Sequence, residues 1–410
     1  HAIAAFGEAA LASASGPNRF ADIARDCATL LGAAEVDDLA DDPDAPPGAG
    51  PVWMGGFAFF DDGPFGDSWR DMPAARFVLP SASLARAGDQ ARLTLNLTVG
   101  PDDDAAQLLA GAESLVDRLR LDDLEDQPPV DQPSAGSAVV SSSSSPEHYE
   151  QSVERASVMI ERGELKKVVL ARQVVLRRER PIDPVRALYM LRDRFPECTT
   201  FALGDKAKVF LGATPELLIR REGRRASTLA LAGSMRRGID EQTDRHLGEQ
   251  LLASAKNNRE HEFVVRRIER TLGRLSAWTA AGERPELVKV KNIQHLATPI
   301  RAQLTEPRPV VELAGLLHPT PAVGGEPWPA AGDVIKSLEA LDRGWYSGGV
   351  GWMDQLEDGE FHVALRSALV EGAQALMFAG AGIVADSDPA AELAETDTKL
   401  EALLPVLSSC

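Results

Sequence analysis

The part of the chain after residue 145 reads as a succession of strands, many of which follow one another without a helix between them. The first of these strands, 166–176, is rich in β-branched residues and apolar on both faces. Further strands are predicted at 208–212, 216–220, 226–231, 287–292, 348–353, 360–370 and 375–384, and helices at about 183–193, 240–273, 330–341 and 389–404. Because hairpin-like turns dominate over strict strand–helix alternation, we predict an α+β fold built on large, mostly antiparallel sheets.

A change of composition divides the chain. Residues 126–145, DQPPVDQPSAGSAVVSSSSS, have no periodic pattern, and their Pro, Ser, Gln and Gly content is typical of a flexible linker. Residues 1–125 hold a short helical stretch, an aromatic strand and a hairpin that turns at Gly88. We therefore expect a scaffold before the linker and a larger region, 146–410, after it.

The charge of the chain limits its partners. The sequence has 43 Lys and Arg against 62 Asp and Glu, a formal net charge of −19. An acidic chain is a poor ligand for nucleic acid or an anionic membrane, and no apolar stretch approaches the roughly 18 residues of a membrane span. Cys27, Cys198 and Cys410 show no CxxC spacing, so we expect no disulfide framework, no zinc site and a reducing cytoplasm. The opening segment lacks the basic region and long apolar core of a signal peptide, so we expect none.

Two lysines open the strand 166–176. Lys167 shares one face with Val169, whereas Lys166 shares the other face with Val168. Burial among such neighbours would lower the pKa of a lysine and let it act as a base. The alternative is that both lysines reach for solvent, and the pattern alone favours that interpretation.

Two glutamates adjoin apolar segments. Glu216 follows a proline and precedes an apolar strand, where burial could make it a general acid, although a solvated turn carboxylate is the better interpretation by pattern alone. Glu260 is in line with Lys256 and Val264, on a helical stripe that otherwise faces inward. The alternative for Glu260 is an i, i+4 ion pair with Lys256.

The last predicted helix carries a charged face. Asp388 is typical of a helix N-cap, as is Ser145 before an earlier helix. Glu392, Glu395 and Lys399 stack at i, i+3 and i+7, which in most helices is a solvated face with a Glu395–Lys399 pair. Two glutamates from separate helices also suit Mg²⁺, which takes oxygen ligands.

Two neighbouring strands offer groups for an anion. Arg366 shares its face with Ala364 and Ala368, which leaves room for an anion beside the guanidinium. The next strand ends in PheAlaGlyAlaGlyIleVal, where backbone N–H groups near Gly380 and Gly382 could bind a carboxylate. The glycine pair alone is a weak signal, since close packing explains most such pairs.

A series of short motifs between residues 145 and 404 is similar to those of the chorismate-utilising enzymes, and among them resembles the isochorismate synthases. The motifs are LysLysValValLeuAlaArg (166–172), AlaThrProGluLeuLeu (213–218), AlaLeuAlaGlySer (230–234), GluHisGluPheValVal (260–265), HisLeuAlaThrPro (295–299), HisProThrProAlaValGlyGly (318–325), ArgGlyTrpTyrSerGly (343–348), AlaLeuArgSerAla (364–368), GlyAlaGlyIleVal (380–384) and GluThrAspThrLys (395–399). The N-terminal 140 residues match only loosely. The resemblance makes 146–410 the chorismate-binding catalytic region.

The resemblance implies a fold and a chemistry. The expected fold is a single large domain whose two pseudo-symmetric halves pack mostly antiparallel sheets around a central cleft, with helices outside. The expected enzyme is Mg²⁺-dependent. By motif, Lys167 would activate the water that attacks ring C2, and Glu216 would protonate the departing C4 hydroxyl. Glu260 and Glu395 would hold Mg²⁺, with Glu392 in a supporting position.

The same motifs imply the substrate contacts. The residues expected around the pyruvyl-ether carboxylate are Arg366, Tyr346, the backbone at Gly382, Lys399 and His295. Thr298 and Ala322 would line the ring pocket. Asn257 is a departure, because several family members place an acidic residue there, so only Glu260 is carried over from that helix.

Motif differences favour one activity within the family. Aminodeoxychorismate synthases carry a nucleophilic lysine where this chain has Ala232. Anthranilate synthases use ammonia and usually lack the water-activating lysine, which is present here as Lys167. We therefore expect an isochorismate synthase, which reversibly converts chorismate to isochorismate. Salicylate synthase, which goes on to eliminate pyruvate, and anthranilate synthase component I are the alternatives.

A catalytically silent relative is a further alternative, from a different functional class. It is disfavoured because Lys167, Glu216, Glu260 and Glu395 are all present. The small molecule chorismate is the expected partner, with no obligatory protein partner and a monomeric chain. The ArgGlyTrpTyr motif slightly favours a role in menaquinone biosynthesis over one in siderophore biosynthesis.

Overall fold

The computed structural model describes residues 1–36, 45–119, 137–204 and 207–410. Two large sheets and one three-stranded sheet are present, and their strands pair antiparallel, which confirms the predicted α+β class. The three-stranded sheet has the order β1 (Ala2–Phe6), β5 (Ala82–Ala87), β6 (Gln90–Leu95). No helix in the described part of the chain is long and apolar enough to cross a membrane.

The ten-stranded sheet combines segments from both ends of the described chain. Its order is β13 (Ser276–Ala281), β15 (Ile293–Leu304), β12 (Arg225–Arg236), β11 (Leu217–Glu222), β18 (Gly359–Val363), β17 (Gly349–Asp354), β3 (Val52–Phe57), β4 (Ala75–Leu79), β2 (Ala10–Ala14), with β14 (Glu286–Lys289) paired to β15. The N-terminal strands β2, β3 and β4 thus extend the same sheet as the strands that follow residue 216.

The seven-stranded sheet supplies the other wall of the molecule's interior. Its order is β16 (Gly325–Glu326), β8 (Lys167–Arg178), β20 (Gln374–Ile383), β19 (Ser367–Glu371), β10 (Lys208–Thr214), β9 (Thr199–Gly204), with β7 (Ala138–Ser142) paired to β8. Residues 126–136 of the predicted linker 126–145 lie outside the described residues. The rest of the linker, 137–145, contains β7.

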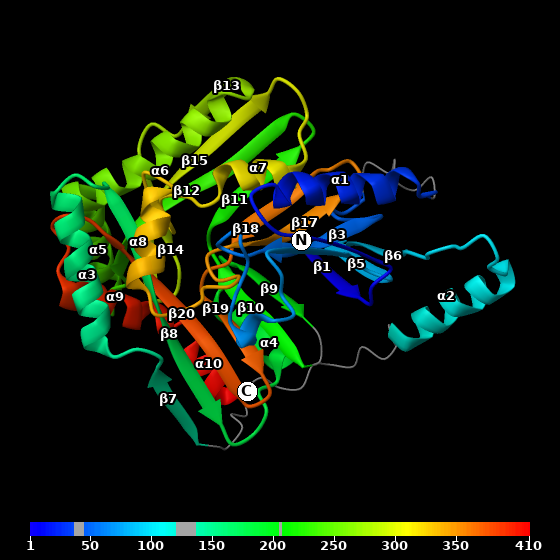
Figure 1. The fold of residues 1–410 in the computed structure, drawn as a ribbon, viewed down its shortest axis with the longest axis horizontal. Coiled ribbons are helices and arrows are strands. Elements are labelled where there is room, and N and C mark those ends of the chain that lie inside the picture. The colour runs from blue at the N-terminus through cyan, green and yellow to red at the C-terminus, as the bar shows by residue number, and fades with distance from the viewer. Residues whose placement is uncertain (37–44, 120–136, 205–206) are drawn as a thin grey trace.

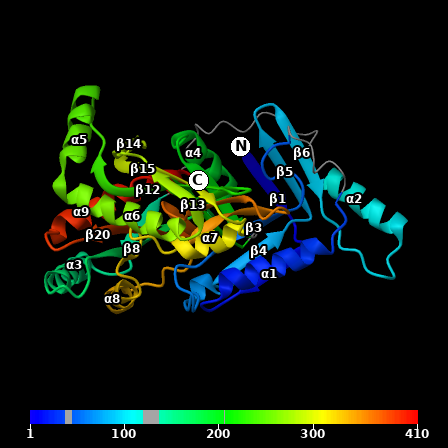
Figure 2. The same ribbon diagram turned by 90° about the horizontal axis from the view of Figure 1, so that it is seen from above.

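Helices cover the sheets, and their ends follow local signals. The helices are α1 (Arg19–Gly32), α2 (Ala105–Leu119), α3 (Pro146–Glu161), α4 (Pro184–Arg194), α5 (Glu241–Ala253), α6 (Ala255–Gly273), α7 (Val310–Leu317), α8 (Ala330–Leu338), α9 (Pro389–Leu400) and α10 (Leu404–Ser409). The side chains of Ser145 and Asp388 cap α3 and α9, as predicted. Figures 1 and 2 show α2 standing out from the body of the molecule, while α3, α5, α6, α8 and α9 gather around the large sheets.

Two predictions of secondary structure are wrong, and one strand was missed. The helix predicted at 240–273 is broken at Ser254, which has extended backbone and caps α6 with its side chain. The strand predicted at 360–370 is interrupted at Arg366, whose φ of 47° lies in the left-handed region. Strand β15 was not predicted, because its buried positions include the polar residues Gln294, His295 and Thr298, which break the apolar pattern.

Candidate functional site

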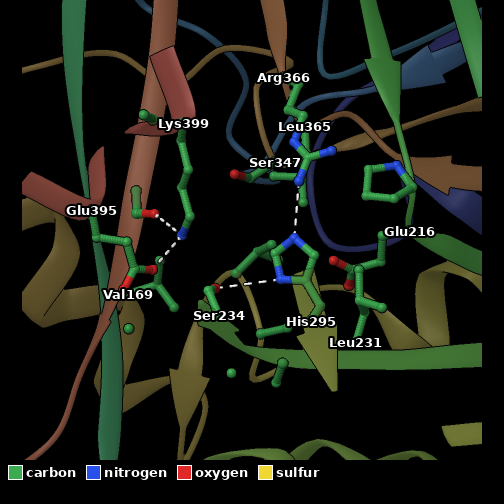
Figure 3. A pocket seen from close by; sticks show the side chains of 18 of the residues that line it. Val169, Glu216, Leu231, Ser234, His295, Ser347, Leu365, Arg366, Glu395 and Lys399 are labelled. Atoms are coloured by element: carbon green, nitrogen blue, oxygen red, sulfur yellow. Dashed lines mark hydrogen bonds and ion pairs between the residues drawn. The ribbon is translucent and has the colours of Figure 1, made fainter. Parts of the chain in front are cut away.

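A pocket with about 750 Å³ of space free of protein atoms, open solvent at its mouth included, lies between the two large sheets. One wall comes from β8 and β20 of the seven-stranded sheet, and the other from β12 and β15 of the ten-stranded sheet. The sequence-predicted residues that line it are Glu216, Glu260, His295, Ala322, Tyr346, Arg366, Gly382, Glu395 and Lys399. Figure 3 shows Glu216, His295, Arg366, Glu395 and Lys399 around this space.

Lys167 lies behind the lining of the pocket, at the start of β8. Its side chain has no exposed surface, and Nζ lies 2.6 Å from Oε1 of Glu260 on α6. Lys166, by contrast, is exposed. The interpretation in which both lysines reach for solvent is therefore wrong for Lys167, whose side chain is buried and paired with Glu260.

Gly382 leaves the space in which this ion pair forms. It lies on β20, paired with Val169 of β8. A Cβ atom at this position would collide with Oε1 of Glu260 and come within 3.0 Å of Cε of Lys167. A side chain at residue 382 would therefore push the pair apart.

Glu216 is buried between β10 and β11, and its side chain faces the pocket. Its backbone is fixed at both ends, because its N–H donates to Oγ1 of Thr214 at 3.3 Å and its carbonyl accepts from the N–H of Val363 at 3.0 Å. Burial raises the pKa of Glu216 to about 8, against the opposing charge of Lys167. The interpretation of Glu216 as a solvated turn residue is therefore wrong, and at neutral pH the group can donate a proton.

Helix α9 brings Glu395 and Lys399 to the pocket. Nζ of Lys399 lies 2.7 Å from Oε1 of Glu395 and donates to the carbonyl of Gly380 at 2.7 Å. Burial alone would lower the pKa of Lys399. The charge and the hydrogen bond of Glu395 outweigh burial, so the pKa of Lys399 lies above its ordinary value. The Glu395–Lys399 pair expected from the sequence thus exists, yet it faces the pocket rather than bulk solvent.

Glu392 does not line the pocket. Its Oε1 accepts from Nζ of Lys256 at 3.1 Å. Burial and the neighbouring charge of Glu395 raise the pKa of Glu392. Lys256 therefore pairs with Glu392, not with Glu260 as the sequence alternative had it.

Arg366 and His295 form a charged and hydrogen-bonded group at the opposite end of the pocket. Nη2 of Arg366 lies 2.9 Å from Nε2 of His295, and Nδ1 of His295 lies 3.4 Å from Oγ of Ser234. Burial, with the charge of Arg366, holds the pKa of His295 well below its usual value. His295 is therefore neutral and accepts at Nε2, which leaves Arg366 as the cation that can meet an anionic ligand.

The apolar part of the pocket contains Tyr346 and Ala322. The ring of Tyr346 stacks on Phe378 with centroids 5.1 Å apart. Thr298, expected to line the ring pocket, does not do so. It is buried behind the wall, and its hydroxyl lies 2.7 Å from Nε2 of His261.

Several pocket residues were not singled out from the sequence. They include Val169, Leu231, Ser234, Val323, Ser347, Leu365 and Phe378. All of these except Phe378 lie within motifs that the resemblance had already marked, so their positions were available as a signal. Phe378 carried none, since it looks like an ordinary core residue.

A family model described as chorismate binding enzyme matches residues 1–408. The chain belongs to the chorismate-binding enzymes. The isochorismate synthase MenF of Bacillus subtilis is 37% identical over 360 residues, which cover 87% of this chain and 75% of that protein. The salicylate biosynthesis isochorismate synthase of Pseudomonas aeruginosa is 39% identical over 365 residues, covering 88% and 75%.

The fold is also similar to a solved structure from this group. The menaquinone-specific isochorismate synthase MenF of Escherichia coli superposes with a TM-score of 0.81, at 27% identity, over 99% of this chain and 85% of that chain. The pocket between the sheets is therefore the candidate site of this chorismate-binding enzyme.

The acidic residues of this chorismate-binding enzyme fit a cation that needs few protein ligands. Among the described residues, no group of three or more His, Cys, Asp or Glu side chains is placed to hold a metal ion. Two carboxylates, Glu260 and Glu395, face the same pocket. Mg²⁺ commonly takes one or two carboxylates and completes its shell with water and substrate, so this donor set fits it.

Proposed function

We propose that the protein is an isochorismate synthase that interconverts chorismate and isochorismate. The observation that carries the proposal is that two buried side chains meet at one pocket: Glu216, on the connection between β10 and β11, lines it, and Lys167, at the start of β8, lies behind its lining. A base and an acid on opposite sides of a flat ring permit water to add at C2 while the C4 hydroxyl leaves, without a covalent intermediate. The relatives named above support the same activity.

In this proposal Lys167 takes the proton from the attacking water as the neutral amine, so its ion pair with Glu260 has to open first. Its wholly buried side chain limits exchange with bulk solvent. Glu216, with a pKa of about 8, is largely protonated at neutral pH and donates to the departing hydroxyl. In the reverse direction the two residues exchange roles, since both directions share one transition state.

The carboxylates of the substrate are assigned to the cationic groups of the pocket. Arg366, held by neutral His295, would bind the pyruvyl-ether carboxylate together with Tyr346 and the backbone at Gly382. The chain as a whole carries −19, so the attraction for a dianion must come from such local groups.

We assign Glu260 and Glu395 as the residues that would hold Mg²⁺, with Glu392 supporting them. When bound there, Mg²⁺ would neutralise and orient the ring carboxylate. Glu260 and Glu395 are each paired with a lysine, so binding of a cation would compete with Lys167 and Lys399.

The experiment that tests the activity is incubation with chorismate and Mg²⁺, with and without ammonia, followed by chromatography of the products. Isochorismate alone is expected. Salicylate with pyruvate, or anthranilate that appears only with ammonia, would identify another activity, and no product at all would indicate a silent family member. Ala232 at the pocket offers no lysine for covalent chemistry, which favours water as the nucleophile.

We further propose that the enzyme works as a monomer in the cytoplasm, without an obligatory protein partner, in menaquinone or siderophore biosynthesis. Its cysteines, Cys27, Cys198 and Cys410, are free thiols, in line with a reducing compartment. All pocket residues fall within 146–410, which we assign as the catalytic region.

A further inference from the structure

Arg172 is a buried arginine that lies outside the pocket. It is on β8, on the same face as Leu170 and Val174, and its side chain is 7% exposed. A charge on an apolar face is costly to bury unless it is paired and hydrogen-bonded. Both partners of Arg172 are on α9: Nε donates to Oγ1 of Thr396 at 2.6 Å, and Nη2 forms an ion pair with Asp397.

This contact falls between the two pocket residues of α9. Glu395 directly precedes Thr396, and Lys399 follows Asp397 by two positions. Because a helix has 3.6 residues per turn, fixing residues 396 and 397 also fixes the directions in which Glu395 and Lys399 point. Thr396 is wholly buried, and its hydroxyl donates to the carbonyl of Leu393 at 2.6 Å while it accepts from Arg172.

The contact also lies beside an open strand edge. β20 pairs with β19 only as far as Met377, whereas its pairing with β8 continues to Ile383. Lys399 reaches the carbonyl of Gly380 on this part of β20, and Arg172 is in register with the adjacent Ala379. Arg172 of β8, and Lys399 through the carbonyl of Gly380 on β20, therefore anchor α9 at neighbouring points of two paired strands.

We infer that Arg172 is a positioning residue, which holds α9 through Thr396 and Asp397 in the rotation at which Glu395 and Lys399 face the pocket. Arg172 does not line the pocket and would not touch the substrate. The inference rests on the proposed function, which assigns Glu395 to Mg²⁺, and on the resemblance, which implies that Lys399 lies beside the substrate.

The double variant Thr396→Val, Asp397→Asn tests this role. Valine keeps the shape of threonine, and the Asp397 side chain is 64% exposed, so the variant is expected to fold. We expect the KM for chorismate to rise about tenfold and Mg²⁺ binding, measured by calorimetry without chorismate, to weaken about tenfold, with a smaller change in kcat. The matched control is Glu401→Gln, which removes an exposed carboxylate just after α9 and should match the parent.

A purely structural role predicts a different result. A lower Tm with unchanged KM and unchanged Mg²⁺ binding would overturn the inference. A crystal structure of the double variant gives a readout that needs no activity: we expect Nζ of Lys399 to move out of hydrogen-bonding distance of the Gly380 carbonyl, and a retained contact would contradict the inference. If the parent converted no chorismate, the proposed function would fail, while the crystal structure would still decide the role of Arg172.

Discussion

Lys167 and Glu260 form an ion pair in the wall of the pocket, with Nζ of the lysine 2.6 Å from Oε1 of the glutamate. The lysine is wholly buried and the glutamate only 12% exposed. Removal of one partner from a buried pair typically costs about 3–5 kcal/mol, because the other charge is left unpaired. Variants at either position therefore need an unfolding measurement beside the activity measurement.

Lys167→Ala should reduce the rate of isochorismate formation by at least about 100-fold, because the proposal assigns Lys167 to take the proton from water. Chorismate binding, measured by calorimetry with Mg²⁺, should be largely retained. Lys166→Ala is the matched control, since Lys166 is the exposed neighbour on the same strand end. Activity of Lys167→Ala within a few fold of the parent would remove Lys167 from the mechanism.

Glu395→Gln should raise the Mg²⁺ concentration needed for half-maximal activity, because the amide keeps the shape and removes an anionic oxygen that Mg²⁺ prefers. The same variant should bind Mg²⁺ more weakly in calorimetry. If it titrates with Mg²⁺ like the parent and like Glu401→Gln, the role of Glu395 is confined to its ion pair with Lys399.

Glu216→Gln should lower kcat/KM for chorismate and for isochorismate by the same factor. A mutation cannot alter the overall equilibrium, so both directions lose equally. We expect a loss of about 10²-fold to 10⁴-fold, the usual contribution of a positioned proton donor. Near-normal turnover in both directions would show that Glu216 takes no part in proton transfer.

The pH dependence of the forward reaction should reflect the protonation of Glu216. With a pKa of about 8, Glu216 loses its proton as the pH rises above 8, and kcat/KM for chorismate should then fall. The free energy of unfolding should also fall as the pH rises. Between about pH 4.5 and 8 Glu216 holds a proton in the folded state that it lacks in the unfolded state, so a rise in pH destabilises the folded state. Denaturant unfolding of the parent and of Glu216→Gln across this range checks the effect, which the variant should lack.

Gly382→Ala should reduce both stability and activity, because its Cβ would collide with Glu260. Overpacking of this kind costs about 1–3 kcal/mol of the free energy of unfolding. The matched control is Gly111→Ala on α2, where an added Cβ meets no atom within 4 Å. Equal melting temperatures and rates for Gly382→Ala and the parent would show that the Lys167–Glu260 pair can shift without consequence.

The secondary structure was predicted best where short-range rules apply. β8 follows its β-branched sequence, and the helices α3 and α9 begin where Ser145 and Asp388 can cap them. These signals depend on residues a few positions apart, so they survive in any tertiary context. Strand β15 was missed for the opposite reason, since distant elements bury its polar residues: His295 meets Arg366 in the pocket, and Thr298 meets His261 of α6.

The pairing of charges could not be predicted from the spacing along the chain. Lys256 is one helical turn from Glu260, yet Glu260 pairs with Lys167 and Lys256 pairs with Glu392. A contact at i, i+4 contributes only about 0.2–0.5 kcal/mol, which a buried partner on another element easily outweighs.

The sequence by itself determined which chemical groups are available: the residue types of the motifs and their order identify the family and offer a lysine, an acid and carboxylates. Only the tertiary structure decided which of them are buried and which face each other. Glu216 becomes an acid with a raised pKa, and Lys167 becomes inaccessible to bulk solvent, because two sheets assembled from distant segments exclude water around them. Desolvation of a charge depends on every element that surrounds it, and no local pattern contains that information.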